Sequence, residues 1–82
     1  MKLCNDKEVR TYDVGDGYKV DVEIKDICYE AWLYNPEYGV KMHMFALLKN
    51  NRHYGEFLSI VEKNLSDYIR VYDEEYKFKK NN

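Results

Sequence analysis

No stretch of the sequence approaches the roughly 20 consecutive apolar residues that a membrane-spanning helix requires. Residues 1–3 lead into charged sequence rather than an apolar export signal, which predicts a cytoplasmic protein. Cysteine is scarce, because Cys4 and Cys28 are the only two. In a reducing compartment we expect free thiols, with Cys28 as a small buried side chain, although two cysteines also suffice for one bridge.

A strong excess of one charge is absent as well. Thirteen Lys and Arg against fifteen Asp and Glu leave a formal net charge of −2, with a pI near 5.6. Affinity for nucleic acid depends on clustered Lys and Arg that displace counterions, so we expect no direct nucleic-acid binding. The short basic cluster of Lys77, Lys79 and Lys80 is typical of a solvated, frayed tail over residues 77–82.

Motifs for catalysis and metal binding are also missing. The soft-metal ligands are Cys4, Cys28, His43 and His53, and no two of them have CxxC, HxxxH or HExxH spacing. Cys28 with His43 is the one conceivable nucleophilic pair, and no oxyanion-loop or phosphate-binding glycine motif accompanies it. We therefore predict no catalytic residue, no metal and no cofactor, and a small enzyme or metal-binding protein ranks third among the function classes.

Apolar residues, in contrast, are plentiful. They make up 45% of the 82 residues and aromatics 16%, which is more than a disordered chain carries. A chain this short buries only about 60% of its unfolded surface, so a second core is not expected. The sequence predicts a single domain over residues 1–82.

The segment "VRTYDVGDGYKVDVEI" predicts the first strand pair. Residues 15–17, Gly-Asp-Gly, tolerate the positive φ of a tight hairpin, and such a loop would pair Val14 with Tyr18 and Tyr12 with Val20. From residue 18 to residue 25 apolar and charged side chains alternate, as in a half-buried strand.

Two further strands are predicted over residues 27–34 and 40–47. Pro36 ends the first of them, because proline lacks an amide donor, and Gly39 closes the turn. All four strands follow one another without a repeat or linker. The sequence therefore predicts a four-stranded antiparallel meander over about residues 7–48.

After residue 53 the apolar period changes from two to about 3.6, which predicts a helix over about residues 54–76. Its apolar stripe consists of Phe57, Val61, Leu65, Tyr68 and Tyr72. This stripe needs a partner, and the sheet is the one available. The expected fold is α+β, with one long C-terminal helix packed on one face of the meander (ββββα).

The register of the second hairpin decides which aromatics the helix covers. A four-residue loop over residues 36–39 would pair Leu33 with Met42 and Ala31 with Met44, and it keeps charged side chains out of the core. A one-residue slip would instead turn Trp32 toward the helix. In the preferred register four side chains point away from the helix and form a candidate protein interface: Trp32, Tyr34, His43 and Phe45.

The leading hypothesis is a non-catalytic protein-binding or regulatory module that occupies the surface of a partner protein, because Trp, Tyr and Phe are enriched at contact surfaces. A self-assembling structural protein, with the same sheet face closing a homodimer, is the alternative. The helix offers a secondary acidic surface that would attract a basic partner. Its residues are Glu56, Asp67, Asp73 and Glu74.

Richness in Lys, Asn, Tyr and Glu with a single Pro resembles the composition of proteins from AT-rich bacterial or phage genomes. Small acidic one-domain chains of that kind include mobile-element inhibitors such as anti-CRISPR proteins. The resemblance is compositional, matches no motif and transfers no residues. It implies an inhibitor that acts by binding another protein.

Overall fold

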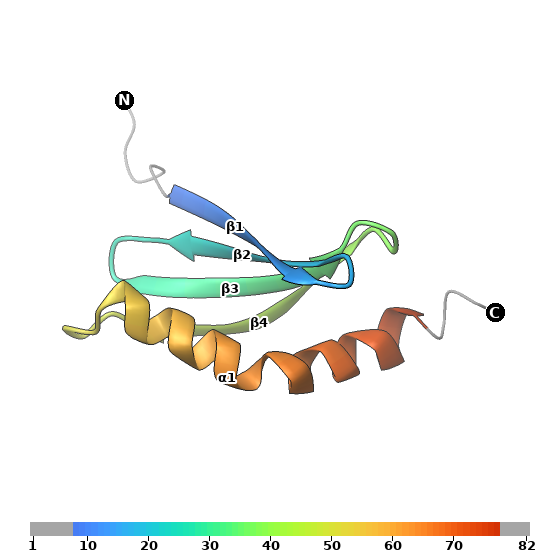
Figure 1. The fold of residues 1–82 in the computed structure, drawn as a ribbon. Coiled ribbons are helices and arrows are strands. Elements are labelled where there is room, and N and C mark those ends of the chain that lie inside the picture. The colour runs from blue at the N-terminus through green and yellow to red at the C-terminus, as the bar shows by residue number, and fades with distance from the viewer. Residues whose placement is uncertain (1–7, 78–82) are drawn as a thin grey trace, which may run out of the picture.

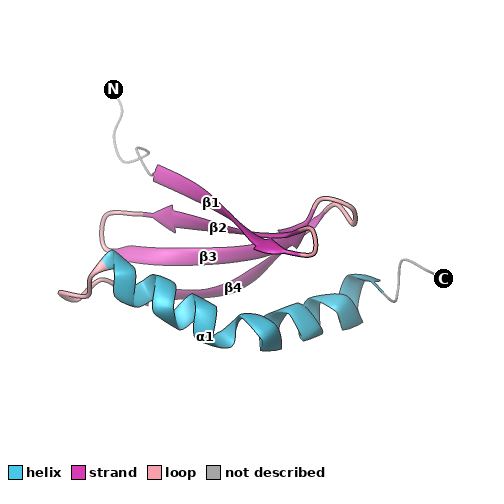
Figure 2. Cartoon of the chain, viewed as in Figure 1, coloured by secondary structure: helices cyan, strands magenta, loops and turns pink. Residues whose placement is uncertain are grey.

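The computed structural model describes residues 8–77, in which one four-stranded sheet lies against one helix (Figures 1 and 2). The sheet is antiparallel throughout, in the order β1-β2-β3-β4. The predicted ββββα fold is confirmed. The expectations for Cys4 and for residues 78–82 lie outside the described residues. The elements are β1 Glu8–Gly15, β2 Tyr18–Ile24, β3 Cys28–Asn35, β4 Val40–Leu48, α1 Tyr54–Tyr72 and the π-helical turn η1 Asp73–Lys77.

The β1–β2 hairpin turns through Gly15, Asp16 and Gly17, which all have positive φ. Tyr12 pairs with Val20, as predicted. Tyr18 pairs with Gly15 rather than with Val14, because the register shifts between Asp13 and Gly15. This irregularity leaves the Val14 side chain against the core instead of opposite Tyr18.

A bulge in β4 corrects the predicted register of the second hairpin. Leu33 pairs with Met42 as expected, but Ala31 pairs with Phe45 and not with Met44. The extra residue, Met44, leaves two successive side chains on the helix side, as a β-bulge does. Met44 is 6% exposed, and the Phe45 ring lies 5.4 Å from the ring of Phe57. The prediction that Phe45 points away from the helix is therefore wrong.

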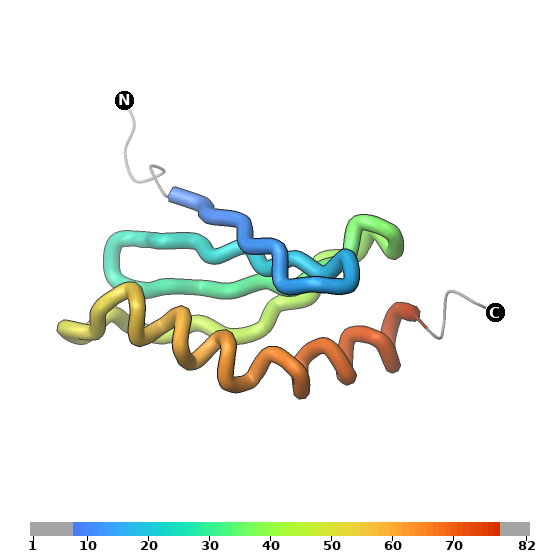
Figure 3. Tube along the Cα trace, viewed as in Figure 1, coloured from blue at the N-terminus to red at the C-terminus, as the bar shows by residue number. Residues whose placement is uncertain are grey.

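The hydrophobic core lies between α1 and the sheet. Figure 3 shows α1 running beneath β3 and β4, the two strands with which its residues make their main contacts. Alternation along β2 and β3 supplies one wall, and the predicted helical stripe supplies the other. The buried apolar side chains are Tyr18, Val20, Val22, Tyr29, Ala31, Leu33, Met44, Phe57, Val61 and Tyr72.

Tyr72 ties the C-terminal end of α1 to the sheet. Its hydroxyl accepts a hydrogen bond from the Asn35 amide at 3.1 Å and donates one to the Val40 carbonyl. Beside it, the Tyr18 hydroxyl donates to the carboxylate of Asp73. The α-helix ends at Tyr72, four residues earlier than predicted, and η1 continues it to Lys77. Within residues 8–77, no helix is both long and apolar enough to cross a membrane.

Candidate functional site

The sheet face opposite α1, called the outer face below, is covered by no other element among residues 8–77 (Figure 1). Strand pairing determines which side chains it carries, because side chains alternate between the two faces. They are Val9, Thr11, Asp13, Lys19, Asp21, Glu23, Cys28, Glu30, Trp32, Tyr34, Lys41, His43, Ala46 and Leu48. Three of the four predicted interface residues, Trp32, Tyr34 and His43, thus lie on one face.

Trp32 occupies the middle of the outer face, between Asp21 on β2 and His43 on β4. The Trp32 and His43 rings meet edge to face, with their centroids 4.7 Å apart. The indole is half-buried, and its Nε1 is buried without a hydrogen-bond partner among the described residues. A native protein pairs nearly all of its buried donors, so this nitrogen needs an explanation.

Asp21 organises a first polar network beside Trp32. Its carboxylate accepts hydrogen bonds from the Thr11 hydroxyl at 2.7 Å and from Lys41 Nζ at 2.8 Å. Tyr34 adds a third donor at 3.2 Å. Burial alone would raise the pKa of Asp21, but these hydrogen bonds outweigh it and the pKa falls below its usual value. Asp21 is therefore an ionised carboxylate that is only 7% exposed.

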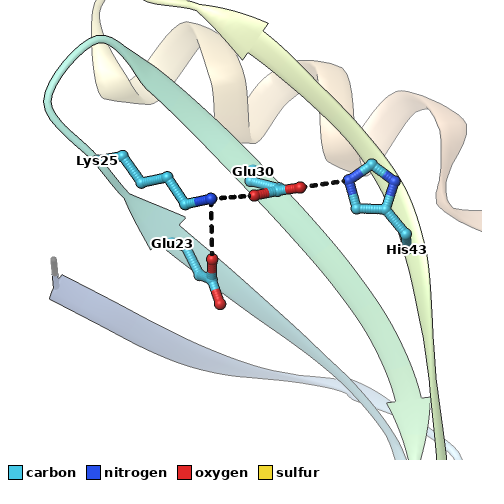
Figure 4. Close-up of polar contacts among 4 residues, drawn as sticks. All are labelled: Glu23, Lys25, Glu30 and His43. Carbon is cyan, nitrogen blue, oxygen red and sulfur yellow. Dashed lines mark hydrogen bonds and ion pairs between the residues drawn. The ribbon is translucent and has the colours of Figure 1, made fainter. Parts of the chain in front are cut away.

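Glu30, two residues before Trp32 on β3, organises a second network that includes Glu23, Lys25 and His43 (Figure 4). One carboxylate oxygen binds Lys25, and the other accepts a hydrogen bond from His43 Nε2 at 2.6 Å. Lys25 also lies 3.5 Å from the carboxylate of Glu23. The hydrogen bond from Lys25 lowers the pKa of Glu30, although burial opposes the shift. Each network therefore contains an ion pair.

An apolar corner adjoins the second network. Ile27 and Leu48 are 68% and 54% exposed, and the Lys49 amide donates to the Ile27 carbonyl at 2.8 Å. Cys28 pairs with Leu48 and is half-buried, less than predicted. His43 pairs instead with Trp32, which lies four residues, or about 13 Å, beyond Cys28 along β3. Cys28 and His43 therefore form no catalytic pair.

The predicted acidic helix surface is dispersed. Glu56 and Asp67 are exposed but lie eleven residues, or about 16 Å, apart along α1. Asp67 pairs with Arg70 at 3.6 Å, and half-buried Asp73 accepts the hydrogen bond from Tyr18. Glu74 is exposed. Among the described residues, no group of three or more His, Cys, Asp or Glu side chains could hold a metal ion.

Comparison with known proteins adds no functional information: no family model, curated protein or solved structure matches the chain. The outer face is thus the candidate site on geometric grounds alone. Strand alternation along β2 is enough to place Asp21 on the outer face. The three hydrogen-bond donors to Asp21 come from three other strands, and only the strand register brings them together.

Proposed function

We propose that the chain is a non-catalytic protein-binding module whose contact surface is the outer face, centred on Trp32. The main support for this proposal is that Nε1 of Trp32 is buried and has no hydrogen-bond partner among the described residues, although it lies in the middle of an uncovered sheet face. A buried donor without an acceptor costs about 1–3 kcal/mol. A partner that supplies an acceptor after a small shift of the indole would recover this energy on binding.

The surroundings of Trp32 support the same function. Central aromatic anchors within a rim of near-neutral contacts are typical of binding hot spots. Here the rim consists of hydrogen-bonded ion pairs whose acids, Asp21 and Glu30, are held by Lys41 and Lys25. Because these charges are already compensated, a partner can cover the rim without leaving a buried charge unpaired.

The module acts by occupying its partner's surface, as an inhibitor from a phage or mobile element would. It requires no bound group and no turnover. We expect it to act in the cytoplasm, where Cys28 remains a thiol. The partner is another protein, because the outer face carries Asp21, Glu23 and Glu30 among its lysines and offers no basic stripe for phosphates.

Site-specific photo-crosslinking in the host cells tests the proposal. A benzophenone amino acid at Tyr34 reports on the outer face, and the same probe at Val71, 43% exposed on α1, is the control. We expect a discrete protein adduct from position 34 alone, and its loss when Trp32→Ala is added. Equal adducts from both positions, or an adduct that survives Trp32→Ala in a folded chain, would contradict the proposal.

Self-association through the same face is the second candidate. It is favoured by Leu48, a large apolar side chain of the outer face that is 54% exposed. Light scattering of the wild-type chain and of Ile27→Ser/Leu48→Ser separates the two candidates. A concentration-independent monomer rules out the homodimer, whereas a dimer lost in the double variant favours it.

A further inference from the structure

A groove of about 360 Å³ lies on the helix side of the sheet, between α1 and the first two strands. It exists because a helix about 10 Å wide covers two strands spaced about 4.8 Å apart, and α1 packs on β3 and β4. The buried part of its lining consists of Val20, Val22 and Val61, each at most 6% exposed. A recess of this volume over buried valines is typical of a pocket for a small molecule.

The apolar part of the groove is elongated. Leu58 and Leu65 line it from the helix and lie about 10 Å apart along the helix axis. The half-buried Val14 lines it from β1. An alkyl chain lying along α1 could bury its surface against these side chains without needing a hydrogen bond.

A polar cluster lies at the end of the groove nearest the start of α1. Tyr12 lines the groove, and its hydroxyl is 2.7 Å from the hydroxyl of Tyr54. The Arg10 guanidinium, on the same face of β1, lies 4.9 Å from the centre of the Tyr54 ring. The two hydroxyls share one hydrogen bond, so the second O–H can donate to a further acceptor. Phenol and guanidinium donors beside an apolar recess match a carboxylate that carries an alkyl chain.

Arg10 already has one carboxylate partner. Its Nε lies 2.7 Å from Glu8, and the two side chains are 48% and 57% exposed. Ion pairs this exposed contribute little to stability, so a ligand can compete with Glu8. A guanidinium also has five N–H donors, which allows it to bind a second carboxylate at the same time.

The charges along the groove determine the direction of such a ligand. Glu62 is the acidic residue that α1 contributes to the lining, and it lies eight residues, or about 12 Å, beyond Tyr54. Asp13 belongs to the outer face, where it pairs with Lys19. A carboxylate would be repelled near Glu62 and attracted near Arg10, so the head group is expected at the start of α1.

We infer that the groove binds a free aliphatic carboxylic acid of medium chain length. The carboxylate accepts hydrogen bonds from Arg10 and from the hydroxyl pair of Tyr12 and Tyr54, and the alkyl chain lies over the buried valines. The contact area is small and the head group stays near water, so we expect a dissociation constant of about 0.1–1 mM. This site lies on the opposite side of the sheet from the outer face and goes beyond the proposed protein-binding function.

The first test titrates octanoate, octylamine and octanol separately into the isotope-labelled full chain at about pH 7 and follows backbone amide shifts. The three compounds share an alkyl chain and differ in the charge of the head group. We expect saturable shifts at Val14, Leu58 and Leu65 with octanoate, an unmoved Trp32 indole, and binding at least about tenfold weaker for the other two compounds. Equal affinity for octylamine, shifts confined to the outer face, or no shift at millimolar octanoate would overturn the inference.

A variant of Arg10 tests the head-group contact. Arg10→Gln should weaken octanoate binding at least about tenfold and leave octanol binding unchanged, because only the charged head group uses the guanidinium. Arg70→Gln is the matched control, since it removes the same charge at an exposed position outside the groove lining. An equal loss in both variants, or no loss in Arg10→Gln, would overturn the assignment.

Chain length tests the apolar contact. From octanoate to hexanoate, each methylene group removed should weaken binding about fourfold, because less alkyl surface is buried. An affinity that does not depend on chain length would place the acid on the surface beside Arg10 and overturn the groove. Trp32→Ala should bind octanoate as the wild-type chain does, and a loss in this folded variant would contradict a site separate from the outer face.

Discussion

Residues on the two faces of the sheet are buried for different physical reasons. On β2, Val20 and Val22 are at most 1% exposed and pack beneath α1, whereas Asp21 between them is 7% exposed on the outer face. The valines are buried by apolar contact, and the carboxylate is buried because three donors compensate it. Near-equal burial therefore does not mean an equal contribution to stability, since a compensated charge yields little net free energy.

This difference assigns separate roles to the faces. Removing an apolar side chain on the helix side loses transfer free energy and leaves a cavity. Outer-face side chains retain access to water and are expected to contribute less to stability. The helix side should hold the fold together, and the outer face should tolerate change and be available for binding.

The largest effect is expected from Phe57→Ala. Phe57 is 0% exposed, and its ring lies 5.2 Å from that of Tyr29 and 5.4 Å from that of Phe45. The truncation should cost about 3–5 kcal/mol of unfolding free energy, much of what a small domain possesses. Urea denaturation measures the loss, with Val71→Ala as the exposed control. A cost below about 1 kcal/mol would contradict the docked helix.

Tyr72→Phe should have the next largest effect. It keeps the ring but removes the hydroxyl that joins the Asn35 amide and the Val40 carbonyl. Leaving these backbone groups without that partner should cost about 2 kcal/mol. Tyr76→Phe removes a hydroxyl from the neighbouring ring and is the matched control. If both variants unfold at the same urea concentration, the hydroxyl of Tyr72 has no anchoring role.

A smaller, pH-dependent effect should come from Asp21. Burial opposes its ionisation, but the hydrogen bonds from Lys41 and Thr11 prevail, so the pKa of Asp21 is lower in the folded than in the unfolded chain. Its stabilising contribution is complete above about pH 5 and is lost as the pH falls through the folded-state pKa. Unfolding curves between pH 7 and pH 2 should therefore decline less steeply for Asp21→Asn. An unchanged slope would show that this carboxylate is not held more tightly in the folded state.

Most of the fold could be predicted from the sequence because its signals are local. The positive φ of residues 15–17, the proline turn and the change of apolar period after residue 53 each act over a few residues. The bulge at Met44 was missed because no glycine or proline marks it. Its position follows from packing, since it turns both Met44 and Phe45 toward α1.

The candidate site was predicted less completely. Alternation placed Trp32, Tyr34 and His43 on one face, but Phe45 was misassigned because one inserted residue reverses the alternation beyond it. The network around Asp21 depends on side chains from all four strands, and the network around Glu30 on side chains from β2, β3 and β4. Sequence spacing carries no information about such contacts until the register is known.

The central claim is that the outer face binds a partner protein through Trp32. Trp32→Ala tests it most directly, with unfolding and crosslinking measured on the same variant. Because the indole is half-buried on the outer face, outside the core beneath α1, the account predicts a loss of only about 1 kcal/mol of unfolding free energy. It also predicts that the adduct formed from position 34 falls at least about tenfold, the loss typical of a central aromatic anchor. Collapse of the fold would make Trp32 a structural residue, and an undiminished adduct in a folded chain would show that the outer face does not bind through it.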